Sequence, residues 1–121
     1  MTAAELVRHM TQVLAFALAV LTRTERTRHE PLEWDGEVER FYTVLGAVDA
    51  AFAAGAPIDR EGERRLVQGP LADVLTHIGQ LHALRRLIGA PVPPESYLNA
   101  DIRIGRLALH DQPEPRSAPR R

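Results

Sequence analysis

An aspartate and a histidine lie four residues apart in a segment whose pattern predicts one helix from Pro70 to Ile88. Residues at this spacing share a face of an α-helix, so the Asp73 carboxylate and the His77 imidazole are predicted to point the same way. His77 falls inside the apolar stripe of this helix and Asp73 at its edge. A buried carboxylate is costly unless it is paired or metal-bound, so the pair indicates a candidate metal site.

A second histidine is predicted to turn inward from a different helix. His9 lies between Phe16 and Val20 in helical projection, on an apolar face near the N-terminus. His9, Asp73 and His77 would supply three ligands and leave coordination positions open, as in catalytic metal sites. Such ligands suit Zn, Ni, Fe or Mn without selecting among them. The alternative is structural: Asp73 is half-exposed and pairs with an arginine or caps a loop, His77 is a hydrogen-bonded core histidine, and both histidines bond to buried carbonyls.

The remaining residues predict no other reactive group, and no catalytic residue can be assigned. His82 points away from His77, and His29 and His110 fall in segments expected to be solvated. The chain has neither lysine nor cysteine, which excludes Schiff-base chemistry, thiolate ligands and a cysteine nucleophile. A formal net charge of −1 gives no field that would attract nucleic acid.

Three main helices are predicted to position these residues. Thr2 and Glu5 form a capping box at the start of the first helix, which should end near Thr22. The apolar run over residues 13–21 is about half of the roughly 20 residues that a membrane span needs, and no small-residue cleavage site follows it. We therefore expect a cytoplasmic protein that does not enter the membrane.

The second helix is predicted to begin after Trp34, with Asp35 as its N-cap, and to stop at Gly55. Glu37 and Glu39 then belong to an acidic helix start, which the helix dipole favours.

The third helix has Pro70 at its first position and Gly89 just past its end, the usual placement of these residues at helix termini. A loop over residues 56–69, with one helical turn near residues 60–66, is predicted to precede it. Together the three helices predict an all-α, up-down helical bundle.

The chain beyond Pro91 is predicted to be irregular, with one helical turn near residues 96–102 and no strand. The helical bundle domain is predicted to cover residues 1–111. Residues 112–121 are rich in proline and arginine and are predicted to form a disordered tail.

The third helix and the segment after it resemble the DinB-like superfamily of metal-dependent enzymes. The matching text is Asp73-Val-Leu-Thr-His77-Ile-Gly-Gln-Leu81, Leu84-Arg-Arg-Leu87, Gly89-Ala-Pro-Val, Glu95, Ala100-Asp-Ile and Gly105-Arg106. The resemblance implies a four-helix bundle in which three histidines hold a divalent metal ion. His9 matches the histidine of an early helix and His77 the second member of an H-x-x-x-H pair, while Asp73 stands at the first member.

Members of this superfamily with known activity look like thiol-dependent transferases and isomerases. The resemblance therefore implies a metal-dependent transferase or hydrolase with a small-molecule thiol as cosubstrate. The alternative is a non-catalytic helical module for dimerisation or partner binding that has lost the metal site, because Asp73 replaces a histidine. The predicted elements lack the family's first helix, which leaves one side of the bundle core uncovered. We therefore expect a homodimer to which the first helix contributes heavily.

Overall fold

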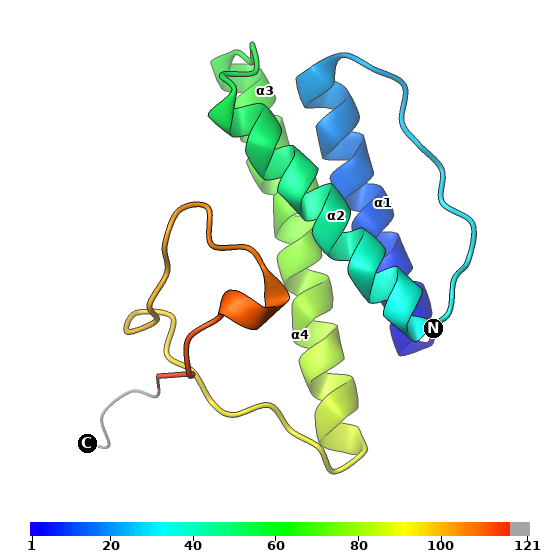
Figure 1. Cartoon of the computed structure of the whole chain (residues 1–121), viewed down its shortest axis with the longest axis vertical. Helices are drawn as coiled ribbons and strands as arrows, with labels where there is room; N and C mark the ends of the chain where they lie inside the picture. Colours follow the sequence, from blue (N-terminus) through cyan, green and yellow to red (C-terminus); the bar gives the residue numbers. More distant parts are fainter. Residues whose placement is uncertain (117–121) are drawn as a thin grey trace.

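The computed structural model describes residues 1–116 of the 121-residue chain. Its helical elements are α1 (Ala3–Thr22), α2 (Trp34–Ala53), α3 (Arg60–Leu66), the π-helical segment η1 (Val67–Leu71), α4 (Ala72–Leu87) and the short 3₁₀ helix η2 (Leu109–Asp111). No strand occurs among residues 1–116. The predicted all-α helical bundle is confirmed, with α1, α2 and α4 as its three long helices (Figure 1).

Helix α1 is the central helix, because both α2 and α4 pack against it. Its start is the predicted capping box, in which the Glu5 N–H donates to Thr2 Oγ1 at 3.2 Å and the Thr2 N–H donates to Glu5 Oε2 at 2.6 Å. Its buried residues are Leu6, Val7, Met10, Thr11, Leu14, Ala15, Ala17 and Leu21. Burial of each large apolar side chain contributes about 1.5–3 kcal/mol, so this helix supplies most of the core's stabilisation.

By length and composition, α1 alone among the helices of residues 1–116 could span a membrane. In its most apolar stretch 44% is buried against the rest of the protein, as in the core helix of a bundle. A signal sequence near an N-terminus meets the same criterion, so the cytoplasmic location remains a prediction.

The start of α2 differs from the prediction. Glu33 rather than Asp35 is the N-cap residue, and its side chain makes no capping hydrogen bond. The first residue of the helix is therefore Trp34, and Asp35 lies inside the helix. The C-terminal end is as predicted. Gly55 has a φ of 74°, and the Ala56 N–H donates to the Ala51 carbonyl at 3.1 Å, which closes the helix.

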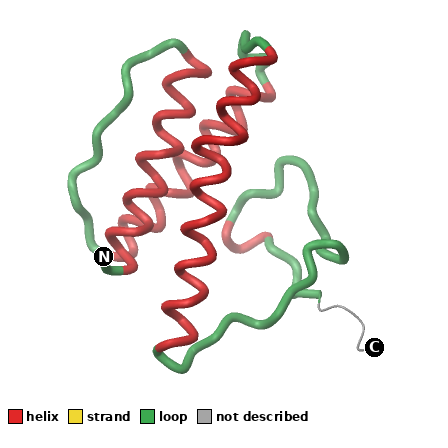
Figure 2. Tube along the Cα trace, turned by 180° about the vertical axis from the view of Figure 1, so that it is seen from behind, coloured by secondary structure: helices red, strands yellow, loops and turns green. Residues whose placement is uncertain are grey.

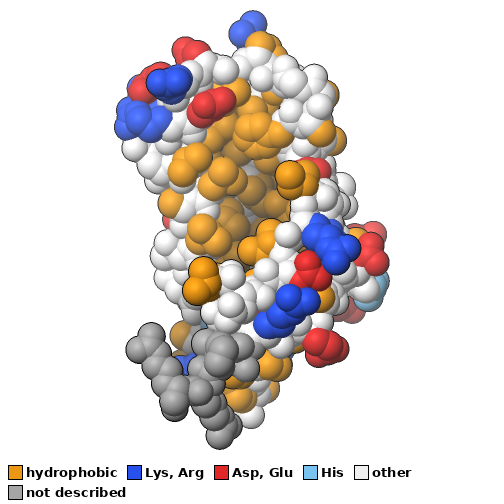
Figure 3. All heavy atoms as spheres, turned by 90° about the vertical axis from the view of Figure 1, so that its left-hand side faces the viewer, with side chains coloured by type: hydrophobic (Ala, Val, Ile, Leu, Met, Phe, Trp, Pro, Cys, Tyr) orange, Lys and Arg blue, Asp and Glu red, His pale blue; other side chains and the backbone are white. Residues whose placement is uncertain are grey.

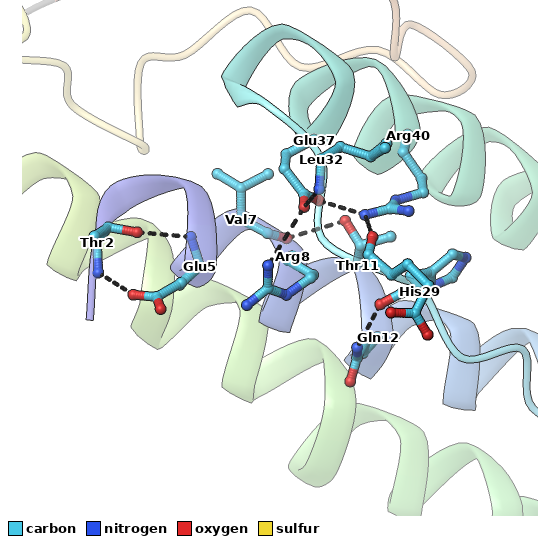
Figure 4. A network of polar contacts seen from close by, with 11 residues as sticks. Thr2, Glu5, Val7, Arg8, Thr11, Gln12, His29, Leu32, Glu37 and Arg40 are labelled. Atoms are coloured by element: carbon cyan, nitrogen blue, oxygen red, sulfur yellow. Dashed lines mark hydrogen bonds and ion pairs between the residues drawn. The ribbon is translucent and has the colours of Figure 1, made fainter.

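Glu37 lies in the predicted acidic start of α2, and it is also buried in a network of ion pairs that the sequence interpretation did not include. Its side chain is 0% exposed and accepts hydrogen bonds from the Leu32 N–H at 2.8 Å and from Arg40 Nη2 at 2.6 Å (Figure 4). Arg8 Nη1 of α1 lies 3.7 Å from the same carboxylate. Burial by itself would raise the pKa of Glu37, but the Leu32 N–H and the two arginines lower it below its ordinary value. This network joins α1, α2 and the loop between them.

The α1–α2 loop, residues 23–33, is also held at His29. The carbonyl of His29 accepts a bond from Gln12 Nε2 at 3.5 Å, and the imidazole is half-buried rather than solvated as predicted. Burial lowers the pKa of His29, and the nearby Arg40 charge lowers it further. The loop therefore runs alongside α1 (Figure 2) and is held there at His29, while its other side chains are exposed.

Pro70 lies inside a continuous helix rather than at the first position of the third helix, as had been predicted. Asp59 is the N-cap of α3, and its side chain accepts a hydrogen bond from the Gly62 N–H at 2.7 Å. The segment η1 then connects α3 directly to α4. In an α-helix the proline ring would clash with the carbonyl four residues earlier. The wider π-helical turn over Val67–Leu71 relieves that clash. The helical turn predicted near residues 60–66 is α3, whereas residues 67–69 of the predicted loop are helical as well.

Helix α4 ends as predicted and extends past the other helices (Figure 1). Gly89 has a φ of 76°, and the Ala90 N–H donates to the Arg85 carbonyl at 2.9 Å. The helical turn predicted near residues 96–102 is a non-helical turn, and η2 forms further on. Residues 112–116 are irregular, and the rest of the predicted tail, 117–121, lies outside the described residues.

Helices α2 and α4 both pack on α1 but make few contacts with each other. Apolar residues of both helices therefore line a partly open face: Phe41 and Leu45 are half-buried, as are Ile78 and Leu81, while Phe52 and Leu75 are exposed. Hydrophobic side chains gather in a hollow on this side of the molecule (Figure 3). The bundle core is thus less completely covered than in a four-helix bundle.

Candidate metal centre

The structure brings together the three predicted ligands. The nearest ligand-type atoms of His9, Asp73 and His77 all lie within 4.8 Å of one another. His9 Nε2 lies 3.5 Å from Asp73 Oδ2, and His77 Nε2 lies 3.3 Å from Asp73 Oδ1. His9 comes from the first half of α1, whereas the other two residues occupy successive turns of α4. The cluster therefore joins two helices that are distant in sequence.

These distances are close to those of a coordination shell. Metal–ligand distances of about 2.0–2.2 Å in a tetrahedral site place neighbouring ligand atoms roughly 3.3–3.6 Å apart. The distances from the Asp73 oxygens to His9 Nε2 and His77 Nε2 lie within this range. The rings of His9 and His77 meet edge to face, with centroids 4.7 Å apart and planes at 88°. Each carboxylate oxygen faces one histidine, so Asp73 can bind an ion through both oxygens or through one after a small rotation.

The hydrogen bonding of His77 favours a ligand role. Its Nδ1 lies 2.7 Å from Gln80 Oε1, an oxygen that accepts the Nδ1 proton. Its Nε2 is buried and has no hydrogen-bond partner. His77 Nε2 lies 3.3 Å from Asp73 Oδ1 without a hydrogen bond, so the two atoms could bind one cation between them. A hydrogen bond at the other ring nitrogen orients a metal-ligating histidine, and Gln80 supplies such a bond here. The residues present fit a divalent ion.

The cluster lies at the surface rather than in the core. The side chains of His9 and Asp73 are 44% and 45% exposed, whereas that of His77 is 14% exposed. Phe16 and Val20, the apolar neighbours that placed His9 towards the core, are themselves exposed. The prediction that His9 is directed into the core was wrong, because His9 lies at the edge of the α1–α4 contact, where its ring meets His77 while 44% of its side chain stays exposed.

The structural alternative is borne out in part, because Asp73 is 45% exposed and His77 is hydrogen-bonded. Neither ring of His9 and His77 bonds to a backbone carbonyl among the described residues, and His77 instead bonds to a glutamine side chain. Within residues 1–116, Asp73 pairs with no arginine, and its near neighbours are the two histidines. His82 and His110 are exposed and lie outside the cluster, as predicted.

A groove of about 590 Å³ opens beside the cluster. His9 and Asp73 lie on its wall, together with the apolar side chains of Val13 and Phe16 and the guanidinium of Arg26. It lies between α1 on one side and η1 with the first turns of α4 on the other. A small molecule that enters this groove would reach the cluster directly.

Sequence reasoning missed two residues of this site. Gln80 follows His77 by three positions, so helical spacing could have identified it as a partner. Arg26 belongs to an irregular loop, and no periodic pattern could have placed it in the groove. Its position depends on how the loop folds back along α1.

No family model, curated protein or solved structure matches the chain. The resemblance to the DinB-like superfamily therefore stays a prediction that rests on the residues quoted for it. The function has to be argued from the geometry of the cluster and the groove.

Proposed function

We propose that the protein is a divalent-metal-dependent enzyme of the DinB-like type, acting as a thiol-dependent transferase or as a hydrolase. The observation that carries the proposal is the cluster of His9, Asp73 and His77, whose ligand-type atoms lie within 4.8 Å of one another, with His77 Nε2 buried and without a hydrogen bond. Three ligands from two helices leave coordination positions free on the solvent side, as catalytic metal sites do.

A divalent ion in this position lowers the pKa of a coordinated water or thiol towards neutrality and so supplies a nucleophile. His9, Asp73 and His77 hold the ion, and Gln80 keeps the His77 ring in the orientation that presents Nε2. The exposed side of the cluster gives a small-molecule thiol access to it. A chain without cysteine cannot supply that thiol itself, so it must be a cosubstrate.

Metal analysis of the protein purified without chelator tests this proposal. We expect about one zinc, nickel, iron or manganese ion per chain. The His9→Ala variant should lose it, and it should remain folded because this side chain is 44% exposed. His82→Ala removes an exposed histidine of α4 outside the cluster and is the matched control. Absence of stoichiometric metal in the wild type, or equal metal content in both variants, would remove the proposal.

A second candidate is a non-catalytic module that dimerises through the open face between α2 and α4. The same chain also exposes apolar residues in its C-terminal segment: Tyr97, Leu98, Ile102 and Ile104. We propose that the occupant of the face is a second copy, because two copies related by a two-fold axis could each cover the other's apolar residues. Since α1 already packs against both α2 and α4 within one chain, this homodimer would rest on α2, α4 and the C-terminal segment rather than on the first helix.

Size-exclusion chromatography with light scattering, on metal-free protein, tests the dimer separately from the metal site. We expect a mass of two chains, and a monomer after Leu75→Glu, which puts a charge on the open face. Glu39→Gln, on the exposed side of α2, should leave the mass unchanged. A monomer at all concentrations of the wild type would exclude this candidate.

A further inference from the structure

We infer that the groove beside the cluster binds a small organic anion, with Arg26 as the counter-ion for its carboxylate or phosphate group. Val13 and Phe16 contact the apolar part of the ligand, and its reacting end lies at His9 and Asp73. This inference rests on the proposed metal-dependent function, because it names the class of substrate for the same site.

The charges around the groove favour an anion. Arg26 and Asp73 are the only arginine and carboxylate residues on its wall. Asp73 faces the two histidines of the cluster, whereas Arg26 forms no ion pair with any carboxylate of residues 1–116. A guanidinium presents a planar fork of N–H donors that matches carboxylate and phosphate oxygens. An unpaired arginine in the wall of a groove is therefore available to an anionic ligand.

A divalent ion would strengthen this preference. Two neutral histidines and one carboxylate would leave the loaded cluster with a net charge of about +1, to which Arg26 adds a second positive charge. The loaded cluster and Arg26 would therefore both attract an anion. The ligand would need an anionic group at Arg26 and a polar reacting group at the cluster.

The loop that carries Arg26 is fixed at several points. Its residue His29 bonds to Gln12 of α1, and its residue Leu32 bonds to the buried Glu37 carboxylate. Figure 2 shows this loop running alongside α1 over its whole length. The backbone near Arg26 therefore does not need to be ordered by the ligand, which reduces the entropic cost of binding.

The groove has the size and surface of a small-molecule site. Its volume of about 590 Å³ lies within the range of roughly 300–1,000 Å³ usual for such sites. Phe16 is 46% exposed and lines the groove, so its ring is available to an aromatic or aliphatic ligand. A wall that carries apolar side chains, one arginine and ligand-type residues fits an amphiphilic anion.

The test measures binding of benzoate, phenyl phosphate and neutral benzyl alcohol by titration calorimetry and by ligand-observed NMR. The wild type, Arg26→Gln and Arg28→Gln are each compared in zinc-loaded and metal-free form. Arg28 lies in the same loop, is exposed and does not line the groove, so its variant matches the loss of charge. Metal content is measured on every sample, and Arg26→Gln should keep the zinc of the wild type.

We expect at least one of the two anions to bind the wild type more tightly than benzyl alcohol does. Arg26→Gln should raise its Kd at least about tenfold, as expected for loss of a charge-assisted hydrogen bond, and Arg28→Gln less than about twofold. Preference for benzoate or for phenyl phosphate then identifies the substrate as a carboxylate or a phosphate.

Equal affinities of the two variants would overturn the inference. So would binding that depends on zinc but not on Arg26, because the anion would then sit on the metal alone. Failure of both anions to bind would overturn it as well. If the wild type holds no zinc but its metal-free form still shows the Arg26-dependent affinity, the metal-dependent function fails while the anion site stands.

Discussion

Replacement of Glu37 by glutamine tests the account of how α1, α2 and their connecting loop are held. The substitution keeps the shape of the side chain but removes the charge that Arg8 and Arg40 face. Breaking a buried ion pair costs about 3–5 kcal/mol. The two arginines are 23% and 17% exposed and regain some hydration, so we expect a loss of about 2–3 kcal/mol. In a domain of this size that lowers the Tm by about 8–12 °C.

The measurement is thermal and urea unfolding followed by circular dichroism at pH 7. Glu39→Gln removes the same charge from an exposed position two residues further along α2, and it should change stability by less than about 0.5 kcal/mol. If both variants lose the same stability, the buried network does not hold the helices together and the reasoning is refuted.

The pH dependence gives a second test of the same residue. The network lowers the pKa of Glu37 in the folded protein below its ordinary value of 4.5. Its stabilising effect is therefore fully present above pH 4.5 and is lost as the pH falls through the folded pKa. The difference in unfolding free energy between the wild type and Glu37→Gln should shrink on acidification below pH 4.5. A difference that stays constant or grows would contradict the assignment.

Three further predictions concern other parts of the structure. The lowered pKa of His29 means that the unfolded chain takes up the proton first, so stability should fall as the pH drops below the ordinary value of 6.5. In the presence of chelator, the free energy of unfolding in urea should change less between pH 7 and 5.5 in His29→Gln than in the wild type. Equal changes in the two proteins would contradict this. Gln80→Leu should raise the metal Kd about 10–100-fold, measured by competition with a chromophoric chelator, because the imidazole loses its orienting acceptor. An unchanged Kd would leave this residue without a role. Gly79→Ala should stabilise the protein by about 0.5–1 kcal/mol, because an added Cβ meets nothing within 4 Å. Gly62→Ala should give no such gain, because its Cβ would lie 2.7 Å from Ile58 Cγ1, and chemical unfolding distinguishes the two.

The sequence predicted those features that depend on local spacing. The capping box at Thr2 and the glycine-terminated ends at Gly55 and Gly89 depend only on neighbouring residues, and the structure has all three. The four-residue spacing of Asp73 and His77 placed both on one helical face for the same reason.

Features that depend on packing were predicted less well. The burial of Glu37 depends on the packing of α2 against α1, which brings Arg8 of α1 and Arg40 of α2 to the same carboxylate. Sequence spacing alone does not show this packing. The π-helical turn around Pro70 exists because α3 and α4 run on as one helix, whereas proline alone usually indicates a helix start. The exposure of His9 likewise depends on which faces of α1 the other helices cover.

The most direct test of the central claim is to observe the histidine nitrogens themselves during a zinc titration. In ¹⁵N-labelled protein, long-range ¹H–¹⁵N spectra report on each imidazole nitrogen separately. We predict that one equivalent of Zn²⁺ shifts Nε2 of His9 and of His77 together to the values of metal-bound nitrogen, while Nδ1 of His77 stays protonated towards Gln80. The exposed His82 should not change. Nε2 resonances of His9 and His77 that stay unchanged, or that move no more than those of His82, would contradict a metal centre at this cluster.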